Sequence, residues 1–173
     1  MDTENKMTKN SRGAAFVAFV LKRLAQDTAF GAALRRADNP ATEYQSWEYL
    51  AAWCDLDNTF ERTCFATVAA GLARAKQSID APASIGAAIA RSYNEGNQDD
   101  SAKRKLRRLL ACDTSTEACQ WVRPVLRLAE SRGVRVNHGQ LLDDLLYFGP
   151  KVKERWAIDF YGRKEDKDDS ISA

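Results

Sequence analysis

Apolar residues along this chain recur every three or four positions and seldom every second position. That spacing places side chains on one face of an α-helix. The stretch from 57 to 72 shows it clearly, because Phe60, Cys64, Val68 and Leu72 follow one another at intervals of four. The only strand-like alternation, at 134–136, is too short for a strand. The pattern therefore predicts an all-α fold, a single bundle of about eight or nine helices.

Short polar residues before the apolar runs mark where these helices should begin, because their side chains accept hydrogen bonds from unpaired backbone N–H groups. The predicted caps are Ser11, Asp27, Asp57, Ser84, Ser101 and Asn137, and capping boxes are predicted at 42–45 and 114–117. Pro124 lies inside the helix expected from 114 to about 132. Since proline removes a backbone hydrogen bond and crowds the preceding turn, we expect a kink or break near Gln120.

Polar segments divide the chain into parts. Residues 1–10 are predicted to be a disordered N-terminus, and 163–173 a disordered acidic tail. The all-helical domain then covers 11–162. Within it, the stretch 94–100 has the most loop-like composition, and it could separate two lobes at 11–93 and 101–162.

Composition limits the class of protein. The chain has 173 residues, of which 45% are hydrophobic and 29% charged, as in an ordinary globular domain. Lys and Arg number 26 against 24 Asp and Glu, which excludes a polybasic protein of the histone type but leaves room for a local basic face. The longest apolar run, 13–21, is far shorter than the ~20 residues of a membrane span. We therefore expect no membrane contact, a cytoplasmic location and reduced thiols.

Residues for catalysis or metal binding are sparse. The four cysteines form no CxxC pair, and no P-loop, GxGxxG or GxSxG motif is present. His138, the single histidine, follows a predicted cap and is interpreted as a surface or capping residue. Asp143 and Asp144 are adjacent on a helix, so their side chains diverge and cannot grip one ion; one of them is expected on a solvated face. We predict no enzyme activity, no metal site and no cofactor.

Charge is unevenly distributed along the chain. From 37 to 61 there are six acids and no base, and from 101 to 111 there are five bases and no acid. At about 100° per residue, Leu106, Leu109 and Leu110 share one side of this second helix, and the bases cover the rest. Like charges four residues apart cost a helix a few tenths of a kcal/mol each, about 0.2–0.5. Either a polyanion offsets this cost, or acids from neighbouring helices do, and the sequence favours neither interpretation.

Further bases could extend the surface, and the tryptophans could stack on nucleobases. Trp47 and Trp156 lie on apolar stripes and are predicted to pack in the core, whereas Trp53 and Trp121 are left unassigned. For Arg35 and Arg36, which end a predicted helix, the partial negative charge of the helix C-terminus offers an ordinary explanation. The candidate nucleic-acid-binding residues are Arg35, Arg36, Lys103, Arg104, Lys105, Arg107, Arg108, Arg123, Arg127, Lys151, Lys153 and Arg155.

An ordered set of segments in the C-terminal half resembles the CasB family, the small subunit of the type I-E CRISPR Cascade surveillance complex. The resemblance covers about residues 12–162 and is weakest between 37 and 80. The Arg35-Arg36 pair near the end of an early helix also matches. The segments are Ser84–Ser92, Lys103–Leu110, Val122–Leu126, Gln140–Phe148 and Lys153–Tyr161.

The resemblance implies a non-enzymatic, all-helical subunit that sits as a pair inside the complex. Its partners would be crRNA, both strands of the target DNA, the backbone and large subunits, and a second copy of itself. The basic faces would hold the nucleic acid and favour the open R-loop. The matching basic positions are Arg35, Arg36, Arg104, Lys105, Arg123 and Lys151. Pro124 and the segment 147–150 depart from the family pattern, which affects the extent of the basic patch and the start of the last helix.

A helical protein–protein adaptor without nucleic-acid binding is the alternative. Its acidic stretch, 37–61, could dock a basic partner. Co-purification of RNA and a multi-subunit complex with the tagged protein would distinguish the two hypotheses.

Overall fold

The computed structural model describes residues 11–162, so the predictions of disorder for 1–10 and 163–173 lie outside the described residues. The described part is all-α, as predicted, with nine α-helices, two short 3₁₀ helices and no strand. The elements are α1 (Arg12–Leu24), α2 (Thr28–Arg35), the 3₁₀ helix η1 (Glu43–Ser46), α3 (Trp47–Leu50), α4 (Thr59–Ala75), α5 (Ile85–Arg91), the 3₁₀ helix η2 (Gly96–Gln98), α6 (Asp100–Leu110), α7 (Ser115–Ser131), α8 (His138–Leu146) and α9 (Pro150–Tyr161).

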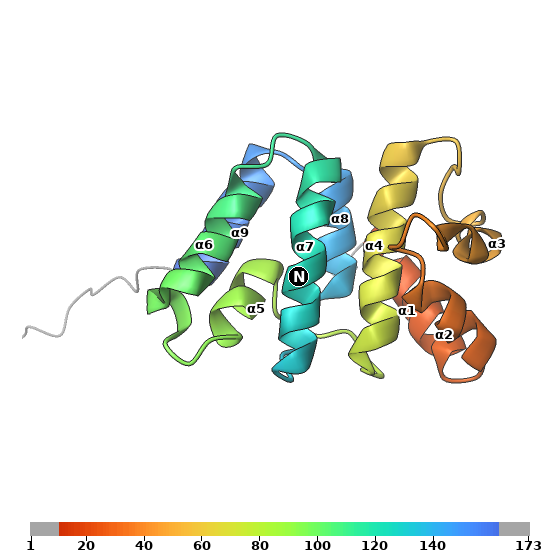
Figure 1. Cartoon of the computed structure of the whole chain (residues 1–173), viewed down its shortest axis with the longest axis horizontal. Coiled ribbons are helices and arrows are strands. Elements are labelled where there is room, and N and C mark those ends of the chain that lie inside the picture. The colour runs from red at the N-terminus through yellow and green to blue at the C-terminus, as the bar shows by residue number, and fades with distance from the viewer. Residues whose placement is uncertain (1–10, 163–173) are drawn as a thin grey trace, which may run out of the picture.

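The helices form two layers. Figure 1 shows α6, α7 and α4 side by side, with α9 behind α6 and α8 behind α7. Helix α1 packs on α8 and α4, and α2 covers the adjoining side of α4. Helix α5 contacts α6, α7 and α9. None of the helices in the described part is long and apolar enough to cross a bilayer.

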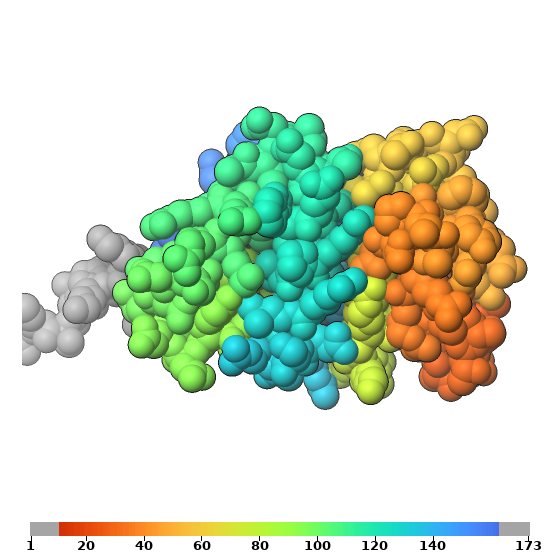
Figure 2. Space-filling view, in the orientation of Figure 1, coloured from red at the N-terminus to blue at the C-terminus, as the bar shows by residue number. Residues whose placement is uncertain are grey.

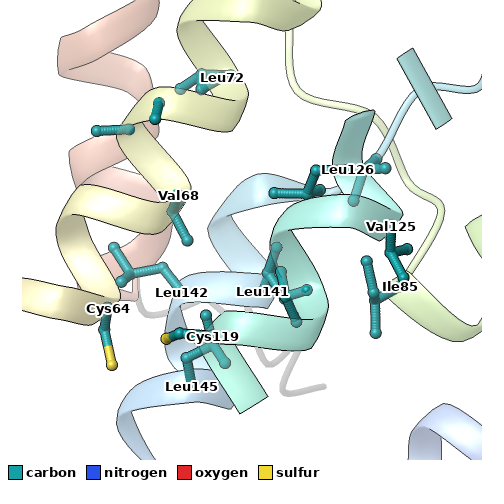
Figure 3. Packing of buried hydrophobic residues seen from close by; sticks show 14 of the residues in the cluster. Cys64, Val68, Leu72, Ile85, Cys119, Val125, Leu126, Leu141, Leu142 and Leu145 are labelled. Carbon is teal, nitrogen blue, oxygen red and sulfur yellow. The ribbon is translucent and has the colours of Figure 1, made fainter. Parts of the chain in front are cut away.

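Apart from Ala83, the buried apolar side chains of residues 11–162 form one cluster. Figure 3 shows side chains of α4, α7 and α8 meeting at its centre, among them Cys64, Cys119 and Leu142. All four cysteines are free and buried, where they pack as small apolar residues. Helix α5 lies N-terminal to the 94–100 loop but packs against α6, α7 and α9, which lie C-terminal to it.

Two glycines allow helices to approach closely. A Cβ added at Gly13 would lie 2.0 Å from the carbonyl oxygen of Gly139, where α1 meets α8. A Cβ at Gly86 would lie 2.0 Å from the carbonyl oxygen of Trp156, where α5 meets α9. Both atoms are backbone, so any larger residue would force the helices apart.

Most predicted helix starts are correct. Ser11, Asp27, Ser84 and Asn137 accept backbone hydrogen bonds at the starts of α1, α2, α5 and α8. The capping box of Thr114 and Glu117 is also present.

Three predicted starts are wrong. Asn58, one residue after Asp57, caps α4, and Asp99 caps α6 two residues before Ser101. At 42–45 the chain forms a 3₁₀ helix without a side-chain cap. There the Thr42 hydroxyl donates to the carbonyl of Arg36 over 3.0 Å, so a local hydrogen bond to the preceding turn takes the place of the predicted cap.

Of the kink or break predicted near Gln120, the break does not occur, because α7 continues from Ser115 through Pro124 to Ser131. Pro124 and Gln120 are both exposed. Water can therefore satisfy the Gln120 carbonyl, which loses its backbone donor to the proline. Burial of Val122, Val125 and other apolar residues on the opposite side of α7 favours a continuous helix.

Helix α4 ends in a strained residue. Its C-cap, Lys76, has φ 51°, in the left-handed region that glycine adopts without cost and other residues adopt at about 1–2 kcal/mol. We expect Lys76→Gly to raise the free energy of unfolding by about 0.5–1 kcal/mol, since relief of strain exceeds the added entropy of the unfolded chain. Urea denaturation measures the change.

The matched control is Ala75→Gly, one residue earlier, where the backbone is still helical. That change should lower the free energy of unfolding by about 0.5–1 kcal/mol. A loss of stability in Lys76→Gly as well would contradict the assignment of strain to Lys76.

Candidate nucleic-acid interface

Helix α6 is held by its apolar side and exposes its bases. Leu106 and Leu109 are fully buried with Ala102, and Leu110 is partly buried, so the predicted anchoring side is confirmed. The Asp99 carboxylate caps the helix through the backbone N–H groups of residues 101 and 102. Its five bases are Lys103, Arg104, Lys105, Arg107 and Arg108; Arg104, Arg107 and Arg108 are exposed, while Lys103 and Lys105 are half-buried.

No carboxylate neutralises these five bases within residues 11–162. Every salt bridge of this region involves a base of another element. Acids from neighbouring helices of the described residues therefore form no ion pairs with the basic helix, which removes the support for one of the two interpretations of its charge.

One side of α6 lines a groove against α7. The groove side of α6 is one stripe of the helix, because its residues follow the first at intervals of three, four and seven. They are Ser101, Arg104, Lys105 and Arg108. Helix α6 borders α7 on the face turned to the viewer in Figure 2. The residues of this α6–α7 groove are Tyr93, Ser101, Arg104, Lys105, Arg108, Trp121, Pro124 and Val125.

The two ends of the α6–α7 groove differ. At one end, the guanidinium carbon of Arg108 lies 4.5 Å from the ring centre of Trp121, a cation–π contact. At the other, Arg104 donates to the hydroxyl of Ser101 over 2.9 Å. Tyr93 lines the wall, and partial burial raises the pKa of its hydroxyl, so it stays neutral at physiological pH. The groove thus combines cations with aromatic surface.

The bases of α7 turn toward α4 and α2. Arg123 donates from Nε and from a terminal nitrogen to the hydroxyl of Thr67 on α4, both over 3.4 Å. A terminal nitrogen of Arg127 lies 3.9 Å from a carboxylate oxygen of Asp38, and its side chain is 62% exposed. Arg127 therefore remains available to an external anion, whereas Arg123 is partly occupied.

Asp38 ties three segments together at this edge. Its carboxylate is buried and accepts two hydrogen bonds from Arg74 of α4, over 2.7 and 2.6 Å. These bonds raise the pKa of the Arg74 guanidinium. Arg74 also donates to the carbonyl of Arg35 over 2.8 Å, which fixes the end of α2. The exposed pair Arg35 and Arg36 is thereby held near Arg127.

Three of the six acids in the stretch 37–61 form ion pairs within the fold. Glu61 pairs with Arg12 over 2.7 Å and Glu43 with Arg62 over 3.9 Å, in addition to the Asp38 contacts. Half of its six acids thus neutralise bases of this chain, which sequence spacing alone did not indicate.

The bases of α9 form a separate group behind α6 (Figure 1). Arg155 donates to the buried carboxylate of Asp144 over 2.8 Å, and Lys153 lies 5.5 Å from the ring centre of Phe148. Lys151 is exposed. Of the three, Arg155 has a structural partner and the two lysines lie at the start of the helix, where a cation opposes the helix dipole.

Two predictions about polar residues are wrong. His138 is buried rather than on the surface: its backbone N–H donates to Asp80 over 2.8 Å, and its ring lies beside Gln77. Neither Asp143 nor Asp144 lies on a solvated face, because Asp143 accepts the N–H of Gly13 over 2.8 Å and Asp144 is buried. These partners are distant in sequence, so local patterns could not reveal them.

The four tryptophans differ in burial. Trp156 is fully buried, as predicted, whereas Trp47 and Trp53 are only partly buried. Trp121 is 39% exposed in the α6–α7 groove. The sequence pattern left Trp121 unassigned and did not indicate Tyr93 or Ser101. The spacing of Trp121, Pro124 and Val125 marks one stripe of α7, but only the antiparallel packing of α6 brings the two stripes together.

The described residues contain no cluster of three or more His, Cys, Asp or Glu side chains suited to a metal ion. The fold and the groove thus define the class: an all-helical protein with an unneutralised cationic surface beside exposed aromatic rings. A scan against models of protein families matches residues 31–161 to the CRISPR-associated protein Cse2 family. The chain belongs to this family, which confirms the resemblance to CasB.

Solved structures agree. CasB from Thermus thermophilus is 27% identical with a TM-score of 0.69, and the match covers 88% of this chain and 99% of that one. A CRISPR-associated protein of the Cse2 family, also from Thermus thermophilus, is 25% identical with a TM-score of 0.71, covering 87% and 98%. CasB from M. ruber is 27% identical with a TM-score of 0.68, covering 87% and 93%. A search of the curated proteins finds no match.

A chain of a CRISPR RNA-guided surveillance complex shares the fold, with a TM-score of 0.66 at 23% identity.

Because Asp38 holds Arg74, Arg127 and the end of α2, we expect Asp38→Asn to lower the free energy of unfolding by about 2 kcal/mol, the value of hydrogen bonds to a charged group. Urea denaturation measures it. Asp57→Asn, an exposed acid of the same stretch, is the control and should change the value by less than about 0.5 kcal/mol. Equal effects of the two variants would contradict an internal role for Asp38.

Proposed function

We propose that this chain is the small subunit of a Cascade-type CRISPR surveillance complex and that its basic surface binds the phosphate backbone of nucleic acid in the R-loop. The observation that supports this most directly is the stripe of Arg104, Lys105 and Arg108, which no carboxylate of the described residues neutralises. The partners would be crRNA, both strands of target DNA, the backbone and large subunits, and a second copy of the chain. The role requires neither catalysis nor a cofactor and would be carried out in the cytoplasm.

Phosphate binding accounts for the unfavourable charge pattern of α6. Like charges four residues apart destabilise the free helix. A phosphate backbone removes that repulsion and releases its own counterions, so the cost in the free protein becomes affinity in the complex. Such contacts carry no sequence information, which suits a complex whose target is read by base pairing with a guide.

Modest affinity is sufficient for this role. The exchange of a DNA duplex for a guide–target duplex is nearly balanced in free energy, so backbone contacts of a few kcal/mol can shift it toward the open R-loop. The chain would supply those contacts without having to separate the strands itself.

The surface extends from the α6–α7 groove in two directions. Across α7 it continues through Arg123 and Arg127 to Arg35 and Arg36, which the Asp38–Arg74 contact holds at the same edge. The other bases of α6, Lys103 and Arg107, and those of α9, Lys151, Lys153 and Arg155, form the second extension, in which Arg155 also holds Asp144. We propose all twelve as nucleic-acid-binding residues.

The alternative, a helical adaptor that docks through its acidic stretch, has less support. Three of the six acids from 37 to 61 already pair with bases of this chain. The five bases of α6, in contrast, have no carboxylate partner among the described residues.

Reversing charge at two groove positions tests the proposal. We expect the double variant Arg104→Glu and Arg108→Glu to weaken binding of single-stranded and duplex DNA of any sequence, with a nearly unchanged thermal midpoint. The slope of log affinity against log salt for single strands should also become shallower by about 1.4, or about 0.7 for each phosphate that is no longer bound. Fluorescence anisotropy with a labelled oligonucleotide measures both.

The matched control is Lys22→Glu with Arg135→Glu, which makes the same change in net charge at two exposed bases outside the groove. It should keep most of the affinity. Equal losses in the two double variants would indicate a nonspecific effect of net charge, and a lack of binding by the unmodified protein at low salt would overturn the proposal.

A further inference from the structure

Trp121 lies where the buried side of α7 borders its exposed side, since Glu117 and Pro124 are exposed. The neighbouring residues Ala118, Val122 and Val125 are buried, whereas Trp121 is 39% exposed in the α6–α7 groove. Of the four tryptophans, it is the one with this much of its surface in water. An indole left in water forgoes the free energy of burial that the other three gain at least in part.

The neighbours of Trp121 keep its ring in place. The Arg108 guanidinium lies 4.5 Å from the ring centre, and Pro124 follows one turn later along α7. A guanidinium plane stacks on nucleobases much as an aromatic ring does. The Arg108–Trp121 pair is therefore a preformed stacking platform with a positive charge.

The cations of α6 continue from this platform along the groove. From Ser101 to Arg108 the helix rises about 10 Å, a length over which its bases can contact only a few successive phosphates of one strand. Arg104 and Lys105 lie within that span, and Tyr93 supplies a second aromatic surface. The dimensions match a short stretch of one strand.

A single strand fits this arrangement better than a duplex. A paired base is stacked on its neighbours and offers no free face to an aromatic side chain, whereas an unpaired base does. A duplex presents mainly its phosphates, which the cations alone can bind. It would therefore make no stacking contact with Trp121 or Tyr93.

We infer that the α6–α7 groove binds an unpaired nucleotide, with its base on the Arg108–Trp121 platform and its flanking phosphates on Arg104 and Lys105. This rests on the proposed function and specifies the form of nucleic acid that the groove takes. The remaining basic surface contacts phosphates of either form.

The test compares single-stranded oligothymidylate with a duplex of the same length, using the full chain and fluorescence anisotropy. We expect Trp121→Leu, which keeps an apolar side chain but removes the ring, to weaken binding of the single strand roughly 5- to 100-fold. Duplex affinity should change by less than about twofold. Trp121→Phe should retain most of the single-strand affinity, because phenylalanine still offers a ring.

Tyr147→Ala removes an exposed aromatic ring outside the groove and should leave both affinities unchanged. Thermal midpoints within a few degrees of the unmodified protein show that each variant is folded. A Trp121→Leu variant that binds single strands as well as the unmodified protein, or that loses duplex affinity equally, would overturn the inference.

The two proposals fail in different ways. If the Arg104→Glu and Arg108→Glu variant binds DNA as well as the unmodified protein, the proposed function is wrong and the groove inference falls with it. If that variant loses affinity while Trp121→Leu keeps it, phosphate binding stands and base stacking alone is wrong.

Discussion

Burial of Trp156 is the interaction on which the arrangement of the C-terminal helices depends. The side chain is fully buried, and its indole nitrogen donates to the buried carboxylate of Asp144 over 2.8 Å. The carbonyl oxygen of Trp156 lies so close to Gly86 that any side chain at position 86 would collide with it. One residue thus sets α9 against α8 and α5, and α6 then packs on α9 and α7. The cationic helix is positioned mainly by the buried side chains of its apolar side, Ala102, Leu106 and Leu109.

That division of roles explains how a nearly neutral chain can present a strong local charge. The acids of the first half are used within the fold, where Asp38, Glu43 and Glu61 join α1, α2, α4 and α7. The bases of α6 have no such partners among the described residues. A net charge of +2 therefore conceals a helix with five bases, whose charge is offset in the sum by acids elsewhere in the chain.

The features that depend on local chemistry could be predicted from the sequence. Helical spacing indicated the all-α class, and most caps were correct because Ser11 or Asn137 needs only the next turn to form its bond. The basic side of α6 was also predicted, since it follows from spacing and charge alone. Features formed by distant segments could not be predicted without the tertiary structure. They are the hydrogen bond from His138 to Asp80, the Asp38–Arg74 ion pair and the cation–π contact of Arg108 with Trp121. Periodicity identifies a helix face but not the helix that packs beside it.

The central claim is that a nucleic-acid strand lies in the α6–α7 groove, and ultraviolet crosslinking tests it most directly. Oligothymidylate is irradiated with the full chain, and the modified peptides are identified by mass spectrometry. The account predicts crosslinks at Trp121 and Tyr93, the aromatic rings of the groove, and none at the more exposed Tyr44 and Tyr147. Crosslinks confined to Tyr44, Tyr147 or other residues outside the groove would contradict it.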